Sequence, residues 1–217
     1  MLEPMPHRVL VVALVTFALL SSGAATNDPL VGEQYHLQTV RAFDAWQASR
    51  GQGMVVAVVD TGVSATHPDL QGRMVGGVDL IEPGTPPDDD NGHGTLVAGV
   101  IAANAGNGVG VAGAAPASFI MPVRVLDAGG GGVAEDVAAG IRWAADHGAH
   151  VINLSLAEAP GQSPDVGALI NSDVEQAIRD ASVRGVLVVA AAGNEGHAGS
   201  PYGRDVPVVV VGATARD

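Results

Sequence analysis

The sequence predicts an α/β fold in which a parallel central sheet is covered by helices on both faces. Short runs of apolar, largely β-branched residues recur along the chain, and stretches with the spacing of amphipathic helices lie between them. Strands buried on both faces of a parallel sheet are apolar without interruption, and strands that alternate with helices are typical of such a sheet. The hydrophobic content of 47% and the 30 glycines fit a compact domain with many tight turns.

The most regular of these runs leads from Met54 to Gly62. Val55 to Val59 are all apolar, and Asp60 follows them directly before a Thr-Gly turn. Because the working residues of open parallel sheets lie just past the carboxyl ends of the strands, Asp60 is expected at that edge. A buried carboxylate needs a hydrogen-bond donor to offset its desolvation, and histidine is a common donor in catalytic sites.

The segment 91–99 supplies such a histidine, His93, at the start of a predicted helix. The expected apolar face of this helix consists of Leu96, Val97, Val100 and Ile101. A second helix is predicted from Val133, Val137, Ile141 and Ala144, and a third begins at the capping-box pattern 172–175 and ends at Gly185. The strands expected after the first one cover residues 118–126, 151–156, 186–192 and 206–212.

The first 25 residues predict a secretory signal peptide. Arg8 precedes an apolar run over residues 9–20, and small residues up to Ala25 form a cleavage site. The apolar run is too short to span a bilayer, so we expect a secreted protein whose mature chain has no stable membrane span. Residues 26–50 then form an N-terminal extension, and residues 51–217 form the main domain.

Charge and composition exclude several classes of function. The formal net charge of −13 argues against binding to nucleic acid or to an anionic membrane surface. The chain has no cysteine, which excludes disulfides, thiolate chemistry and cysteine-bound metals. Residues 108–113 match the Gly-x-Gly-x-x-Gly pattern of dinucleotide sites, but they follow a predicted helix instead of a strand. We therefore discount nucleotide binding.

Three segments together carry a family resemblance. They are Asp60-Thr61-Gly62, the stretch Asn91-Gly92-His93-Gly94-Thr95, and Ala-Ala-Gly followed by Asn194. In this order they resemble the motifs of the subtilisin-like serine proteases. The resemblance implies that Asp60 orients His93, that His93 acts as the base, and that the amide of Asn194 donates to the oxyanion.

The resemblance also implies how substrate and metal bind. An extended peptide or protein substrate would lie as an added strand beside two segments, the loop with Gly130, Gly131 and Gly132 and the strand end with Ser155 and Leu156. The family usually has glycine after that strand end, where this chain has Ala157, whose methyl group could narrow the first specificity pocket. Calcium is the implied cofactor, with Asp69 and Asn107 at ligand positions.

The nucleophile of the family is the one element that these residues lack. The family serine stands in a Gly-Thr-Ser-x-Ala segment, which does not occur in the 217 residues. We therefore expect the C-terminal part of the domain to be missing, one face of the sheet to lack cover, and the chain alone to resist fluorophosphonate labelling. The short segment before the first strand leaves no room for a folded pro-segment, which resembles the mycosin-like secreted branch.

Two functions remain open at this point. The first is a secreted serine endopeptidase with Asp60 and His93 as two members of its triad. The second is a non-catalytic remnant of the same fold that still binds peptides. Labelling by a fluorophosphonate distinguishes them, because that reagent requires an activated serine.

Overall fold

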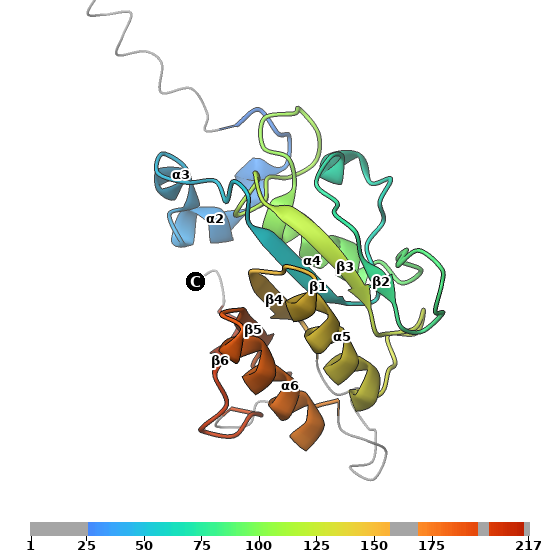
Figure 1. The fold of residues 1–217 in the computed structure, drawn as a ribbon. Coiled ribbons are helices and arrows are strands. Elements are labelled where there is room, and N and C mark those ends of the chain that lie inside the picture. Colours follow the sequence, from blue (N-terminus) through green and yellow to red (C-terminus); the bar gives the residue numbers. More distant parts are fainter. Residues whose placement is uncertain (1–25, 157–168, 195–199, 215–217) are drawn as a thin grey trace, which may run out of the picture.

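The structure is a computed structural model and describes residues 26–156, 169–194 and 200–214 (Figure 1). The predicted signal peptide and Ala157 lie outside the described residues. Six parallel strands form one sheet in the order β2-β3-β1-β4-β5-β6, which confirms the predicted α/β class. The strands are β1 (Val55–Asp60), β2 (Val78–Asp79), β3 (Phe119–Arg124), β4 (Val151–Leu154), β5 (Leu187–Ala191) and β6 (Val208–Val211).

Strand β1 lies in the middle of the sheet because its side chains are apolar on both faces. Val56 to Asp60 are buried, and β1 pairs with β3 on one side and with β4 on the other. Asp60 is the last residue of the strand and pairs in register with Arg124 of β3. The continuous apolar run therefore places one carboxylate at the carboxyl edge of the sheet, as predicted.

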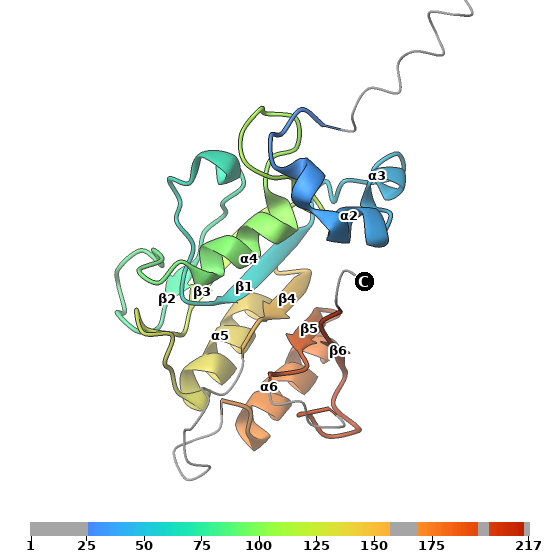
Figure 2. The ribbon, with the colours of Figure 1, turned by 180° about the vertical axis from the view of Figure 1, so that it is seen from behind.

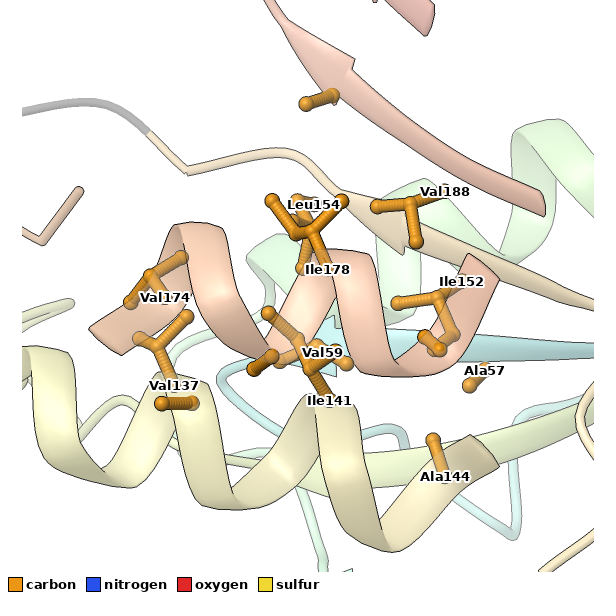
Figure 3. Close-up of a cluster of buried hydrophobic side chains, with 14 of the residues drawn as sticks. Ala57, Val59, Val137, Ile141, Ala144, Ile152, Leu154, Val174, Ile178 and Val188 are labelled. Atoms are coloured by element: carbon orange, nitrogen blue, oxygen red, sulfur yellow. The ribbon is translucent and has the colours of Figure 1, made fainter. Parts of the chain in front are cut away.

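Helices α5 (Ala134–Asp146) and α6 (Ser172–Val183) cover one face of the sheet, in front of it in Figure 1. The main core lies between these helices and the strands, as Figure 3 shows. Each fully buried Leu or Ile side chain there stabilises the fold by about 1.5–3 kcal/mol. The largest contributors are Ile141, Ile152, Leu154 and Ile178.

Helix α4 (His93–Ala102) packs on the opposite face, which Figure 2 shows from its own side. Here the predicted apolar face was wrong in part: Leu96 is 73% exposed and Val100 is 51% exposed. The small residues Gly94, Ala98 and Ala102 face the sheet instead. Because their side chains are so short, the helix axis lies close to β1, and the larger side chains are left at its flank and outer surface.

Beyond α4, several apolar side chains on the same face of the sheet are exposed among the described residues. Side chains of β5 and β6 alternate between the two faces, and those directed away from α6 include Leu187, Val209 and Val211, which are exposed. Among the described residues, α4 is the helix packed on this face, and it contacts β1 and β3. In the part of the chain that the structure describes, no helix covers the face over β4 to β6.

Two helix starts differ in detail from the predicted ones. The N-cap of α6 is Asn171, one residue before the predicted Ser172, and its side chain accepts hydrogen bonds from the backbone N–H groups of Asp173 and Val174. The third helical residue is then Val174, which cannot return a side-chain hydrogen bond, so the predicted capping box does not form. Val133 precedes α5 as its N-cap and is exposed instead of lining its apolar face. The end of α6 agrees with the prediction, since Gly185 follows it with a φ of +82°.

The segment before β1 packs against the main domain. It contains a short 3-10 turn (Val31–Glu33) and the helices α2 (Tyr35–Thr39) and α3 (Ala42–Ala45). Leu37 and Trp46 form a small core with Ala112, and Gln34 exchanges two hydrogen bonds with the backbone of Ala112. Within the described part of the chain, every helix is too short or too polar to cross a bilayer.

Candidate active site

Asp60 and His93 meet at the carboxyl edge of the sheet. The Nδ1 atom of His93 lies 2.7 Å from Oδ1 of Asp60. The same carboxylate oxygen accepts the backbone N–H of Thr61, also at 2.7 Å. The Asp60 side chain is fully buried, whereas the His93 side chain is 49% exposed. The imidazole is thus held at Nδ1 by Asp60, and its Nε2 is open to a reactant.

Gly94 allows this contact. A Cβ atom at Gly94 would lie 2.1 Å from the carbonyl oxygen of Gly62 and 3.2 Å from Oδ1 of Asp60. The backbone of α4 therefore rests directly on the turn that follows β1. The N–H of Gly94 also donates to Oγ1 of Thr61 at 3.0 Å. A glycine after His93 is required for the start of the helix to come this close.

An ion-pair network supports the loop that leads from β2 to His93. Arg124 and Asp79 are both buried, and Nη1 of Arg124 lies 3.0 Å from Oδ2 of Asp79. Nη2 of Arg124 binds Asp90 at 3.0 Å, so that one guanidinium joins both ends of the loop. Buried charges require such pairing. Sequence reasoning missed this network, because the three residues are far apart and belong to no motif.

The loop with the predicted substrate-binding glycines is held by Asp127. Its Oδ1 accepts the N–H groups of Gly129 and Gly131, and its own N–H donates to the carbonyl of Gly131. Asn91 ties this loop to the start of α4, since its Nδ2 donates to the carbonyl of Ala128 and its Oδ1 accepts from the N–H of His93. Asn91 thus connects the predicted substrate-binding loop to His93. Gly130 has a φ of +78°, and Gly132 packs against Val125.

The other predicted substrate-binding residues follow β4. Ser155 accepts a hydrogen bond from Nδ2 of Asn153, and Leu156 is buried in the main core. With its side chain buried, Leu156 can offer only backbone groups to a ligand. Asn194 comes three residues after β5 and is exposed. Because the strands are parallel, Asn194 leaves the sheet at the same edge as Asp60, with β4 between their strands.

Asp69 and Asn107, the predicted calcium ligands, are in contact. Nδ2 of Asn107 donates to Oδ1 of Asp69 at 2.9 Å, and Val111 N–H donates to Oδ2. The structure adds Asp28, which sequence reasoning missed. Its carboxylate accepts the N–H groups of Gly106, Asn107 and Gly108. The glycine-rich loop that resembled a dinucleotide fingerprint thus encloses two carboxylates.

This arrangement fits a hard cation better than a phosphate. Asp28 and Asp69 are both buried, and neither forms an ion pair within the described residues. Asn107 contacts both carboxylates, through its backbone N–H to Asp28 and its side-chain amide to Asp69. Buried carboxylates are usually paired with a positive charge or bound to a metal, and calcium takes carboxylate, amide and carbonyl oxygens. The described part of the chain holds no group of three or more His, Asp or Glu side chains suited to a metal. Loop oxygens would therefore have to complete the ligand set.

Comparison with known proteins agrees with this geometry. The sequence profile described as the Subtilase family matches residues 51–215. The chain belongs to the subtilase family. It is 45% identical to thermitase from Thermoactinomyces vulgaris over 177 residues. This aligned region covers 81% of this chain and 60% of thermitase. This subtilase chain is also 48% identical over 166 residues to Subtilisin Savinase from Lederbergia lenta, covering 76% of this chain and 56% of that protein.

A third relative is a thermophilic serine proteinase from Bacillus sp. (strain AK1). It is 43% identical over 166 residues, covering 76% of this chain and 39% of that protein. The subtilase chain thus spans between 39% and 60% of the length of these relatives. The expected family resemblance is confirmed.

Proposed function

We propose that this subtilase chain carries the Asp and His members of the active site of a serine endopeptidase. The contact of 2.7 Å between Asp60 and His93 is the observation that carries the proposal. A carboxylate at Nδ1 selects the tautomer whose Nε2 is free to accept a proton. His93 then takes the proton of a serine hydroxyl and later returns it to the leaving amine.

The remaining chemistry is assigned to groups at the same sheet edge. The amide of Asn194 donates to the oxyanion of the tetrahedral intermediate, a contribution of roughly 10²–10³ in kcat at such a site. The nucleophilic serine comes from outside these 217 residues, because none of their serines stands in a Gly-Thr-Ser-x-Ala segment. Extended peptides pair with the backbone of the Gly130–Gly132 loop and of Ser155–Leu156.

Labelling and hydrolysis test this function. The reading frame that contains these residues is expressed as far as it extends, and the product is treated with a fluorophosphonate and with an unstructured protein substrate. We expect a serine to be labelled and the substrate to be cleaved. The 217 residues alone are expected to bind the peptide without labelling. A longer product that contains the serine segment but neither labels nor cleaves would favour the non-catalytic peptide-binding alternative.

We further propose that calcium binds where Asp28, Asp69 and Asn107 converge. The carboxylates supply the negative charge, and turning the Asn107 amide by half a rotation directs its oxygen inward. Carbonyl oxygens of the glycine-rich loop complete the coordination. Bound calcium would join the N-terminal segment, the turn at Asp69 and the loop 105–111. Its role is to stabilise the fold, and no catalytic step involves it.

Removal of calcium is expected to lower the melting temperature by about 5 to 10 °C. Calcium at a hundredfold excess over its Kd stabilises the folded state by about 2.7 kcal/mol. In a domain of this size, each kcal/mol changes the melting temperature by about 2–4 °C. Calorimetry with EDTA and with added calcium measures it. The Asp69→Asn variant should lose the response and Asp127→Asn should keep it. Equal melting temperatures with calcium and with EDTA would contradict the site.

The apolar segment 9–20 with its small-residue site at Ala25 supports export of the protein through a signal peptide. We propose that the mature chain acts outside the cytoplasm. The absence of cysteine is compatible with this location, because calcium can provide the stabilisation that disulfides provide in other exported domains.

A further inference from the structure

One carboxylate that the proposed mechanism does not use lies between the segments that carry Asp60 and His93. Asp89 is half-buried and precedes α4 by four residues. Its side chain accepts five hydrogen bonds, none of which comes from either member of the Asp60–His93 pair. The donors to Oδ1 are Thr61 Oγ1 (2.8 Å), Asn91 N (3.1 Å) and Gly92 N (2.8 Å), and those to Oδ2 are Thr95 N (2.9 Å) and Thr95 Oγ1 (2.6 Å).

Two threonine hydroxyls connect the end of β1 and the start of α4, one from each element, and each accepts a backbone hydrogen bond from the other element. Thr61 follows β1, and its Oγ1 accepts the N–H of Gly94 in α4 at 3.0 Å. Thr95 lies in α4, and its Oγ1 accepts the N–H of Ser64 from the segment after β1 at 3.0 Å. Each hydroxyl therefore accepts from the other element while it donates to Asp89.

Asp89 determines the direction of both hydroxyls. A hydroxyl has a single proton and accepts through its lone pairs. Because each threonine gives its proton to Asp89, its lone pairs are directed at the backbone N–H of the opposite element. A carboxylate is the one side chain that offers acceptors on both sides. An amide would present N–H groups to one of the hydroxyls, which would then have to turn.

We propose that Asp89 is a positioning residue that fixes the Asp60–His93 pair by holding the start of α4 against the end of β1. The proposal deepens the proposed function and rests on it. Thr61 is adjacent to Asp60, and Gly94 is adjacent to His93. A loosening of the contacts between these neighbours therefore lengthens the hydrogen bond from His93 to Asp60.

The charge of Asp89 agrees with this role. Burial alone would raise the pKa of Asp89, but hydrogen bonds from Thr95, Gly92 and Thr61 hold it below its ordinary value of 3.8. The stabilisation from a lowered pKa is complete above the unfolded-state value and is lost as the pH falls through the folded-state value. Asp89 is therefore ionised at neutral pH, and its carboxylate can accept all five hydrogen bonds there. The other charged side chains on this loop are Glu82 and Asp88, which are exposed, and Asp90, which is paired with Arg124.

Proton NMR of the 217-residue chain tests the proposal. The Nδ1–H proton of a histidine held by a short hydrogen bond gives a separate low-field resonance, whereas a loosely held proton exchanges with water and its signal disappears. We expect the His93 resonance in the unchanged chain and its loss in Asp89→Asn and in Thr61→Val. Thr61→Ser restores the hydroxyl and should retain the signal. Asp88→Asn removes the same charge one residue earlier and should also retain it.

Retention of the resonance in both Asp89→Asn and Thr61→Val would overturn the proposal, as would its absence from the unchanged chain. The backbone amide spectrum shows which variants are folded, and if Asp89→Asn does not fold, the comparison of Thr61→Val with Thr61→Ser decides. The readout needs neither serine nor substrate. Loss of the signal in the variants, together with a complete lack of peptidase activity in the longer product that contains the serine segment, would support the positioning role and reject the proposed function alone.

Discussion

Replacement of His93 by alanine is expected to lower kcat for peptide hydrolysis by about 10⁶-fold in a form of the protein that contains the serine. The serine hydroxyl then has no base, and the buried Asp60 cannot reach it. Asp60→Asn keeps the geometry but selects the wrong tautomer, at a cost of about 10⁴-fold. KM should change little in both variants, because neither side chain is placed against the substrate backbone. Steady-state kinetics with a chromogenic peptide measure both parameters.

His147 offers a control for this experiment. It stacks on Trp143 at the end of α5, with 3.9 Å between the ring centroids, and lies in no motif of the family. His147→Ala should leave kcat within about a factor of two of the unchanged protein, because surface substitutions usually change the free energy by no more than about 0.5 kcal/mol. A His93→Ala variant that keeps more than a tenth of the activity would show that the base lies elsewhere.

Gly94→Ala is expected to have a large effect on stability. The new methyl group would lie 2.1 Å from the carbonyl oxygen of Gly62, a backbone atom that cannot rotate away. The start of α4 must move off the turn, which we estimate to lower the free energy of unfolding by roughly 1–3 kcal/mol or more. The same movement separates His93 from Asp60, so that activity falls with stability. Denaturant titration gives the first effect and the His93 Nδ1–H resonance gives the second.

Gly99 is the matched control, because it lies in the same helix with no atom near the position of an added Cβ. Gly99→Ala should stabilise the protein by about 1 kcal/mol through helix propensity. The two substitutions are chemically identical and differ only in what the methyl group meets. Equal effects of the two would mean that α4 does not rest on the turn after β1.

The central strand and its aspartate could be predicted from sequence, because an apolar run that ends in Asp-Thr-Gly fits few other structures. The face of α4 could not be predicted. The positions of Leu96 and Val100 satisfy the spacing of a buried stripe, but that spacing says nothing about how close the helix approaches the sheet. The small side chains of Gly94 and Ala98 decide the approach, and a count of large apolar residues overlooks them.

The site was predictable where it depends on local motifs and not where distant residues meet. His93 and Asp60 come from two recognisable segments. Asp28, by contrast, is a single carboxylate before a proline, which in a sequence is indistinguishable from a turn former. Asp89 could have been suspected, because an acidic residue shortly before a helix often caps it. The reciprocal hydrogen bonds through Thr61 and Thr95 follow only from the way the strand and helix cross.

The attachment of the N-terminal segment also bears on the timing of folding. Gln34 finds its partner at Ala112, which is 78 residues later in the chain. At a synthesis rate of about 5–20 residues per second, this partner emerges about 4 to 16 s after Gln34 itself. Until then the apolar side chains of Leu37 and Trp46 can pack only within their own segment, against Ala42 and Phe43. The segment that precedes the whole sheet in the sequence therefore reaches its final place only after β1, β2 and α4 have been made.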